Sequence, residues 1–116
     1  MSDMVLDVQT LPMEKLRNNG ISFNYNDITN LCIKYNVIEL SVFGSSIRSD
    51  FNKDSDIDIL VSFNKNSDVS LFDIMDLERE FTELLKREVD VVEKESLKNP
   101  IRKHRILSTR EIIYAA

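Results

Sequence analysis

Two segments of the chain alternate apolar and polar residues with the period of a β-strand. In residues 37–43, Ile38, Leu40 and Val42 alternate with more polar neighbours, and this pattern predicts a half-buried strand. A second strand is expected over residues 56–63, whose alternate positions carry the apolar side chains Ile57, Ile59, Val61 and Phe63. Each strand is therefore expected to turn one face toward a core and to keep polar groups on the other face.

Two further segments repeat apolar residues at every third or fourth position, which predicts amphipathic helices. The first helix is expected to be capped by Asn26 or Asp27, and its apolar stripe consists of Ile28, Leu31, Cys32 and Tyr35. The second is expected to begin at Ser70, which forms a capping box with Asp73. It runs to about Lys86, and its stripe consists of Ile74, Leu77, Phe81 and Leu84. The remaining Phe and Met residues also fall at helix or strand spacing, so we expect them in the core.

The last third of the chain adds shorter elements. We expect a brief strand over residues 89–92, one or two helical turns around 101–106 after the break at Asn99-Pro100, and a final strand over 111–114. The fold class that results is α/β (α+β), with a small mixed β-sheet and helices packed on it.

The chain, residues 1–116, is of a size to form one domain, and no linker or internal repeat divides it. Residues 1–24 are interpreted as an N-terminal extension. A short helix that begins near Leu11 is expected to end at Asn18-Asn19-Gly20, a helix-stop and turn signal. The sequence assigns this extension no role.

Acidic residues outnumber basic residues by 20 to 15, and the formal net charge is −5. A protein whose principal partner is nucleic acid usually carries the opposite bias, so we do not expect such a partner. The basic residues that gather late in the chain are Lys98, Arg102, Lys103, Arg105 and Arg110. We interpret them as the solvated side of an amphipathic terminal segment.

The hydropathy of the chain and its single Cys and His residues indicate its cellular location and exclude some kinds of site. No apolar stretch approaches the length of a membrane span, and the N-terminus lacks a secretory signal pattern, so we expect a cytoplasmic protein without a membrane partner. The single Cys32 excludes an internal disulfide, and its position on a helical stripe predicts a core side chain. His104, the only histidine, is expected at the surface.

Two carboxylates occupy neighbouring same-face positions of the second predicted strand. Residues two apart in a strand point to the same face, so Asp56 and Asp58 are expected to project together. Such a pair of like charges is unfavourable unless a cation lies between them. Carboxylate oxygens without a nearby His or Cys suit Mg²⁺ or Mn²⁺ rather than zinc.

Asp90 supplies a third carboxylate within the apolar residues 89–92. If that strand pairs beside the strand of Asp56 and Asp58, backbones about 4.8 Å apart bring all three carboxylates close enough to share two Mg²⁺ ions. Two such ions clamp the attacking and leaving oxygens of an in-line phosphoryl displacement. Taken singly, each aspartate is more simply explained as a loop cap or an exposed edge residue. Only their combination favours a metal site.

A glycine–serine turn precedes these aspartates. Gly44 directly follows an apolar strand, where glycine allows the backbone to approach a ligand closely. Ser45 and Ser46 offer hydroxyl and N–H groups to the oxygens of a triphosphate, and Arg48 offers a charge-assisted contact to the same phosphates. Ten residues separate Ser45 from Asp56.

This arrangement resembles the polymerase-β-type nucleotidyltransferase superfamily: a strand, Gly44-Ser45, ten residues, Asp56-Ile57-Asp58, then a helix and Val89-Asp90-Val91. The shortness of the chain points to the minimal nucleotidyltransferase branch, and the likeness runs from about Asn26 to the C-terminus. Relatives often carry Arg-Gly-Asp after the turn, where this chain has Arg48-Ser49-Asp50. The resemblance implies a polymerase-β-like nucleotidyltransferase fold. The catalytic and metal-binding residues that it implies are Asp56, Asp58 and Asp90, and the nucleotide-binding residues are Gly44, Ser45, Ser46 and Arg48.

Members of this branch are commonly the antitoxin of a two-component system whose toxin is a small helical HEPN-domain ribonuclease. The resemblance therefore implies a protein adenylyltransferase that moves AMP from Mg²⁺-bound ATP to a tyrosine hydroxyl of the toxin and so blocks its ribonuclease site. It implies a nucleoside triphosphate and a HEPN-domain toxin as partners, with assembly as a hetero-oligomer with the toxin or as a homo-oligomer.

In this hypothesis the acceptor hydroxyl attacks the α-phosphorus, pyrophosphate leaves, and Asp90 accepts the proton. Two other functions stay open. One is a non-catalytic antitoxin that neutralises its toxin by direct binding. The other is a nucleotidyltransferase that acts on a small molecule, although such relatives usually need an extra helical domain to shape the acceptor pocket.

Overall fold

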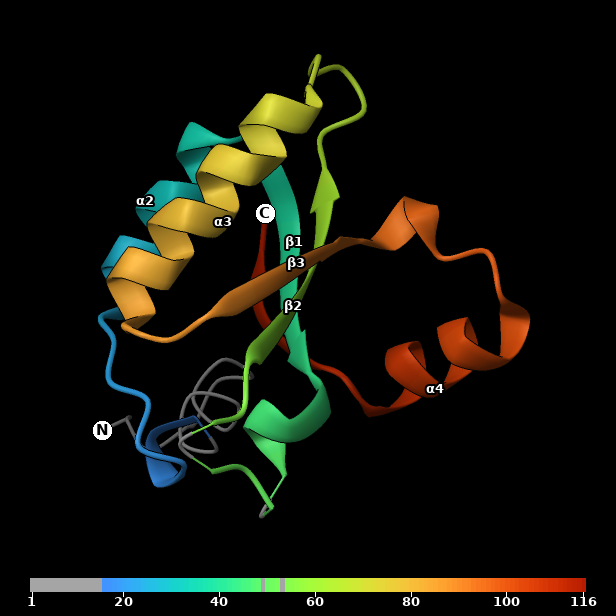
Figure 1. The fold of residues 1–116 in the computed structure, drawn as a ribbon. Coiled ribbons are helices and arrows are strands. Elements are labelled where there is room, and N and C mark those ends of the chain that lie inside the picture. The colour runs from blue at the N-terminus through green and yellow to red at the C-terminus, as the bar shows by residue number, and fades with distance from the viewer. Residues whose placement is uncertain (1–15, 49, 53) are drawn as a thin grey trace, which may run out of the picture.

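A computed structural model describes residues 16–116 apart from Ser49 and Lys53. Its elements, in chain order, are α2 (Tyr25–Lys34), β1 (Val37–Phe43), the 3₁₀ turn η2 (Gly44–Ile47), β2 (Ile57–Phe63), α3 (Leu71–Leu85), β3 (Val89–Glu93), the 3₁₀ turn η3 (Lys94–Ser96), α4 (Pro100–Thr109) and β4 (Glu111–Ala115). Most of the helix expected from Leu11 lies outside the described residues, but its last part is described, and residues 16–18 are helical. Figure 1 shows α2 and α3 on one side of the sheet and α4 on the other.

The sheet has the strand order β3-β2-β1-β4. β1 pairs antiparallel with β2 and with β4, whereas β2 pairs parallel with β3. A parallel neighbour requires a crossover connection, and α3 provides it. The predicted mixed sheet with helices packed on it is confirmed.

The main core fills the space between the sheet and the helices α2 and α3. From β2 it receives Ile57, Ile59 and Val61, and from α3 it receives Leu77 and Phe81, all of them at most 1% exposed. The alternation in the sequence had predicted this division of β2. Cys32 is likewise 0% exposed, as predicted, and its burial raises the pKa of the thiol to about 12.

The starts of the two long helices test the predicted caps. α3 begins with the predicted capping box, in which the Asp73 N–H donates to Ser70 Oγ and the Ser70 N–H donates to Asp73 Oδ2. The prediction for α2 is wrong, because the cap is Asn24, whose side-chain oxygen accepts from the N–H of Asn26. Asn and Asp recur within these four residues, and each side chain is chemically able to cap a helix.

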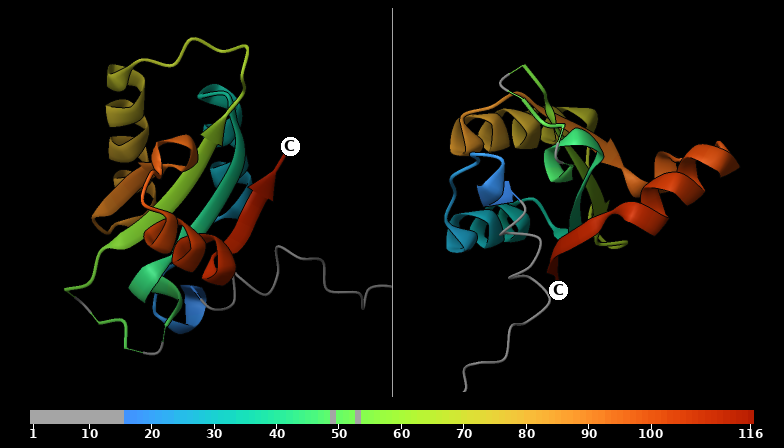
Figure 2. Two further views of the ribbon diagram at one scale, coloured as in Figure 1. Left: turned by 90° about the vertical axis from the view of Figure 1, so that its right-hand side faces the viewer. Right: turned by 90° about the horizontal axis from the view of Figure 1, so that it is seen from below.

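The opposite face of the sheet carries a smaller apolar cluster, made of Phe43, Leu60, Leu97 and Ile106. Ile106 holds α4 against this face, and the left view of Figure 2 shows α4 in front of the sheet, near η2. At ten residues, α4 is longer than the one or two turns expected. Among its residues Ile106 is the one that is buried, so the helix leaves little apolar periodicity in the sequence.

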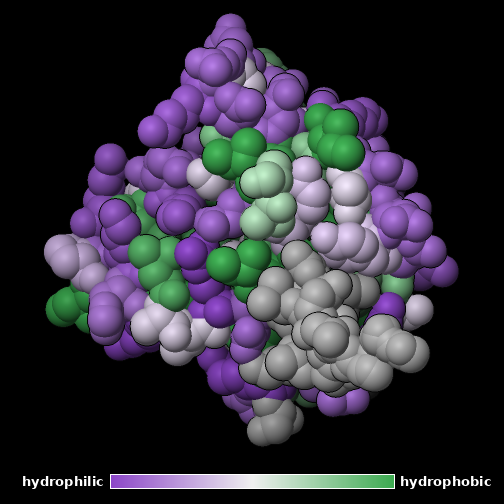
Figure 3. All heavy atoms as spheres, turned by 180° about the vertical axis from the view of Figure 1, so that it is seen from behind, coloured by the Kyte–Doolittle hydropathy of each residue, from purple (hydrophilic) through white to green (hydrophobic). Residues whose placement is uncertain are grey.

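The surface departs from expectation at the start of α3. Phe72 is 74% exposed and Met75 is 56% exposed, so the expectation of a core position is wrong for both. His104 is exposed, as predicted. Seen from behind and outside the grey residues, apolar side chains form small islands among hydrophilic ones (Figure 3). Within the described part of the chain, no helix is long and apolar enough to cross a membrane.

Candidate functional site

The parallel pairing of β2 and β3 brings two of the predicted carboxylates together. Asp58 pairs with Asp90 in the register of the two strands, and on its other side Asp58 pairs with Phe43 of β1. Directly paired residues point to the same face of a sheet, so Asp58 and Asp90 share the face that α4 crosses. Asp56 precedes β2 by one residue and, like Asp90, is exposed.

The electrostatics of Asp58 show how closely charged groups surround it. Burial raises the pKa of its carboxyl group above the ordinary value, and the negative charges of Asp90 and Asp56 raise this pKa further. The guanidinium groups of Arg48 and Arg102 act in the opposite direction. A carboxylate with a raised pKa beside both like and opposite charges is typical of a functional site.

Gly44 lies directly against the Asp58 carboxylate. Its φ of +72° is in the left-handed region, and a Cβ added to it would lie 2.5 Å from Asp58 Oδ2. Glycine therefore suits both the backbone conformation and the close approach. The glycine–serine turn and the aspartates, which the sequence shows as separate motifs, meet at this contact.

The other residues of the turn divide into two groups. Ser46 is 0% exposed, and its hydroxyl donates to the Phe43 carbonyl oxygen at 3.2 Å. This hydroxyl, which sequence reasoning had offered to a phosphate, is engaged inside the protein. Ser45 keeps a partly exposed side chain. The exposed Arg48 donates from Nε to Asp50 Oδ1 at 3.1 Å.

The donor set fits magnesium by its chemistry. Asp56, Asp58 and Asp90 offer only carboxylate oxygens, and the missing Cβ of Gly44 gives the Asp58 carboxylate the room that it occupies. Across residues 16–48, 50–52 and 54–116, no group of three or more His, Cys, Asp or Glu side chains is arranged as a ready metal site. Mg²⁺ usually takes one or two protein carboxylates together with phosphate oxygens and water, so an open arrangement of this kind is compatible with it.

The model of the polymerase beta nucleotidyltransferase family matches residues 26–116. This chain belongs to that family. Protein adenylyltransferase MntA of Thermococcus cleftensis is 41% identical to it over 81 residues, which are 70% of this chain and 77% of that protein.

Solved structures support the fold assignment at lower identity. A crystal structure of a toxin–antitoxin pair with AMP-PNP matches with a TM-score of 0.65 and 20% identity, covering 81% of this chain and 75% of that chain. A complex of tri-AMPylated Shewanella oneidensis HEPN toxin with MNT antitoxin matches with a TM-score of 0.58 and 18% identity, covering 87% of this chain and 73% of that chain.

Sequence reasoning about this nucleotidyltransferase missed Asn19. Its side-chain Nδ2 donates to the carbonyl oxygens of Ser46 at 2.7 Å and of Arg48 at 3.1 Å. Leu16 and Ile21, each 1% exposed, anchor the Asn19 segment in the main core. Part of the N-terminal extension therefore supports the glycine–serine turn. The helix-stop signal revealed the turn at Asn19 but not its partners.

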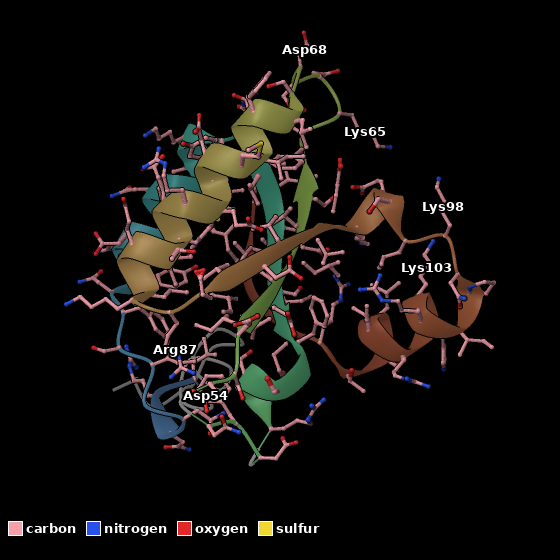
Figure 4. All side chains as sticks on the ribbon, viewed as in Figure 1. Asp54, Lys65, Asp68, Arg87, Lys98 and Lys103 are labelled. Atoms are coloured by element: carbon pink, nitrogen blue, oxygen red, sulfur yellow. The ribbon has the colours of Figure 1, made fainter. Side chains whose placement is uncertain are left out.

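The loop that leads to Asp56 is held by Arg87, which the sequence also did not single out. Arg87 Nη2 donates to the carbonyl oxygens of Asn52 and Ser55, both at 2.7 Å, and its guanidinium group lies 4.5 Å from the centre of the Phe51 ring. Figure 4 shows Arg87 and Asp54 in the same region below the sheet. These contacts fix the approach of the loop to the carboxylates.

The late basic residues do not act as one solvated face. Arg110 is half-buried and donates to Glu39 Oε1 at 2.8 Å, so the expectation is wrong for this residue. Arg102 and Arg105 line a pocket of about 210 Å³ together with Phe43, Gly44, Arg48, Ile106 and Thr109. Lys98 and Lys103 are exposed on the side of the molecule where α4 lies (Figure 4).

A larger hollow of about 420 Å³ lies elsewhere, between α2 and α3. Its lining residues include Asn30 and Lys34 of α2 and Glu80 and Glu83 of α3. Because these helices cover the face of the sheet opposite Asp58, this hollow is separate from the carboxylates.

Proposed function

We propose that this nucleotidyltransferase transfers AMP from ATP to a tyrosine hydroxyl of a HEPN-domain toxin and thereby acts as the antitoxin of that toxin. The name of the Thermococcus relative, a protein adenylyltransferase, supports a protein acceptor, and the AMPylated toxin of the Shewanella complex supports a HEPN toxin as that acceptor. The observation that carries the proposal is the position of Asp58, which pairs with Asp90 and contacts Gly44.

In this proposal Asp56, Asp58 and Asp90 would hold Mg²⁺, which when bound would neutralise charge on the triphosphate and lower the pKa of the acceptor hydroxyl. Gly44 allows the phosphates to approach the backbone of η2, and Ser45 adds a hydroxyl and an N–H donor. Contrary to what its sequence position suggested, Ser46 does not offer its hydroxyl to a phosphate. The hydroxyl instead stabilises the turn by donating to the Phe43 carbonyl oxygen.

The transfer forms a bond between the acceptor oxygen and the α-phosphorus. The bond from the α-phosphorus to its bridging oxygen breaks, and pyrophosphate leaves. Asp90 accepts the proton of the acceptor hydroxyl, because its carboxylate is exposed and adjoins Asp58. The exposure of Asp56 and Asp90 favours an acceptor on the surface of another protein over a small molecule, which would need an enclosing wall.

Mass spectrometry of the toxin after co-expression tests this function. We expect AMP-sized mass increases on the toxin with the wild-type chain and none with Asp58→Asn. The matched control is Asp54→Asn, which removes an exposed carboxylate from the loop before β2 and should keep transfer intact.

The same experiment separates the alternatives. Full neutralisation of the toxin by the wild-type chain without any AMP-sized increase would favour an antitoxin that acts by binding alone. Equal transfer by the wild-type chain and by Asp58→Asn would refute the role of the carboxylates.

A further inference from the structure

One face of α4 is turned toward Gly44 and Arg48. Arg102, Arg105, Ile106 and Thr109 recur at spacings of three and four residues, so they lie on the same side of the helix. Ile106 is 6% exposed and packs in the cluster that contains Phe43. The packing of Ile106 therefore fixes which way the two arginines point.

Arg102 and Arg105 have no carboxylate partner among the residues that the structure describes. Within the described part of the chain, neither side chain forms an ion pair, whereas Arg110 at the end of the same segment pairs with Glu39. Both line the pocket of about 210 Å³ that also contains Gly44 and Arg48.

We infer that Arg102 and Arg105, together with Arg48 and the backbone at Gly44, form a subsite for the polyphosphate tail of the nucleotide. This inference rests on the proposed function and adds α4 as a second wall of the nucleotide site. A ligand here meets the guanidinium groups that line the pocket, and it meets Gly44, against which the Asp58 carboxylate lies. A polyphosphate chelated to Mg²⁺ satisfies both, because its charge suits the guanidinium groups and its oxygens share the cation with the carboxylates.

The pocket favours a phosphate ligand over an acidic protein surface. All four of these basic side chains, Lys98, Arg102, Lys103 and Arg105, are exposed, but Lys98 and Lys103 do not line the pocket. Arg102 and Arg105 instead adjoin Gly44, whose conformation brings the backbone close to any ligand in the pocket.

Calorimetric titration of the full chain tests the inference, with Mg²⁺–ATP, Mg²⁺–pyrophosphate and adenosine as separate ligands. The test variants are Arg102→Ala, Arg105→Ala and the two substitutions together. The matched control is Lys98→Ala with Lys103→Ala, which removes the same charge from the same segment outside the pocket. Thermal unfolding of each variant verifies that it is folded, as expected from the anchoring of α4 by Ile106.

We expect each arginine substitution to weaken binding of Mg²⁺–ATP and Mg²⁺–pyrophosphate about tenfold, and the double substitution about a hundredfold. Adenosine binding should stay unchanged, and the lysine control should change phosphate binding about twofold at most through its long-range charge. Wild-type affinity in the arginine variant, or an equal loss in the lysine control, would overturn the inference. Absence of binding of both phosphate ligands to the wild-type chain would also overturn it.

The outcome is distinguishable from a failure of the proposed function. If the wild-type chain binds Mg²⁺–pyrophosphate through the arginines but transfers no AMP, the subsite stands and the proposed function fails. If AMP is transferred but the arginine variant keeps wild-type phosphate affinity and loses affinity for the toxin, the subsite fails and α4 docks the partner instead.

Discussion

The two faces of the sheet differ in composition: one packs the main core, and the other carries carboxylates of the candidate site. The face toward α2 and α3 is apolar, and β2 contributes to it Ile57, Ile59 and Val61, all nearly inaccessible to solvent. The face toward α4 carries Asp58 from the same strand, with Asp90 beside it. Among the described residues, its apolar cluster has four buried members, whereas the main core has sixteen.

This difference shows how a small domain tolerates an unfavourable site. The main core supplies most of the hydrophobic stabilisation, so the second face is free to carry groups that cost stability. The raised pKa of Asp58 records that cost, because burial and the adjacent carboxylates disfavour its charged form. The comparison predicts that substitutions on the first face reduce stability, whereas substitutions on the second face mainly reduce function.

The largest effect on stability is expected at Phe81. This side chain is 0% exposed on the first face, and Phe81→Ala should lower the free energy of unfolding by about 3–5 kcal/mol. Urea denaturation measures the change. Phe72→Ala is the control from the same helix, and because Phe72 is 74% exposed it should change stability by less than about 0.5 kcal/mol. Similar losses from the two variants would contradict the core assignment.

Gly44→Ala should reduce both the stability of the fold and the rate of AMP transfer. Alanine in the left-handed region costs about 1–2 kcal/mol, and the new Cβ would displace the Asp58 carboxylate, reducing AMP transfer about a hundredfold. Gly20→Ala is a matched control, since Gly20 has a φ of +82° and no atom within 4 Å of an added Cβ. It should lose similar stability but keep transfer. Loss of transfer in both variants would show that the contact with Asp58 is not the cause.

Asn19→Ala tests whether the N-terminal segment positions the glycine–serine turn. Removing its two hydrogen bonds should lower the free energy of unfolding by about 1 kcal/mol and raise the KM for ATP more than it lowers kcat. Asn18→Ala removes an exposed amide from the preceding position and serves as the control. An unchanged KM in Asn19→Ala would leave this segment with a role in stability alone.

The smallest change in stability is expected for Asp58→Asn, and this substitution should stabilise the fold, whereas the preceding ones destabilise it. The pKa of Asp58 is raised above 3.8 in the folded chain. The stabilisation that its protonated carboxyl group contributes to folding is therefore fully present below the unfolded pKa, and it is lost as the pH rises through the folded pKa. Without Mg²⁺, Asp58→Asn should therefore raise the free energy of unfolding near neutral pH and have little effect near about pH 3. Denaturation at both pH values measures this, and destabilisation at neutral pH would contradict the stated cost of the carboxylate.

The strands and the capping box were predictable because their signals are local. Alternation located β1 and β2, and Ser70 with Asp73 located the start of α3. The sequence predicts the Asp90 strand but does not specify that it pairs with the Asp58 strand, since pairing is a long-range property that no local pattern specifies.

The rest depended on contacts that leave no pattern in the sequence. Asn19 reaches carbonyl oxygens 27 and 29 residues away, and Ser46 turns its hydroxyl inward rather than toward a ligand. The pocket side of α4 was missed because Arg102 and Arg105 resemble ordinary solvated residues in the sequence. Their position in the pocket depends on Ile106, which anchors α4 on the sheet and so orients both arginines.

The central claim is that the carboxylates of two strands and the turn after a third belong to one cation-binding site. Mn²⁺, a paramagnetic substitute for Mg²⁺, tests it directly by broadening the amide resonances near which it binds. Added with a non-hydrolysable ATP analogue, it should broaden the signals of Gly44, Asp58 and Asp90 together. A sharp Asp90 signal beside a broadened Asp58 signal would contradict the account.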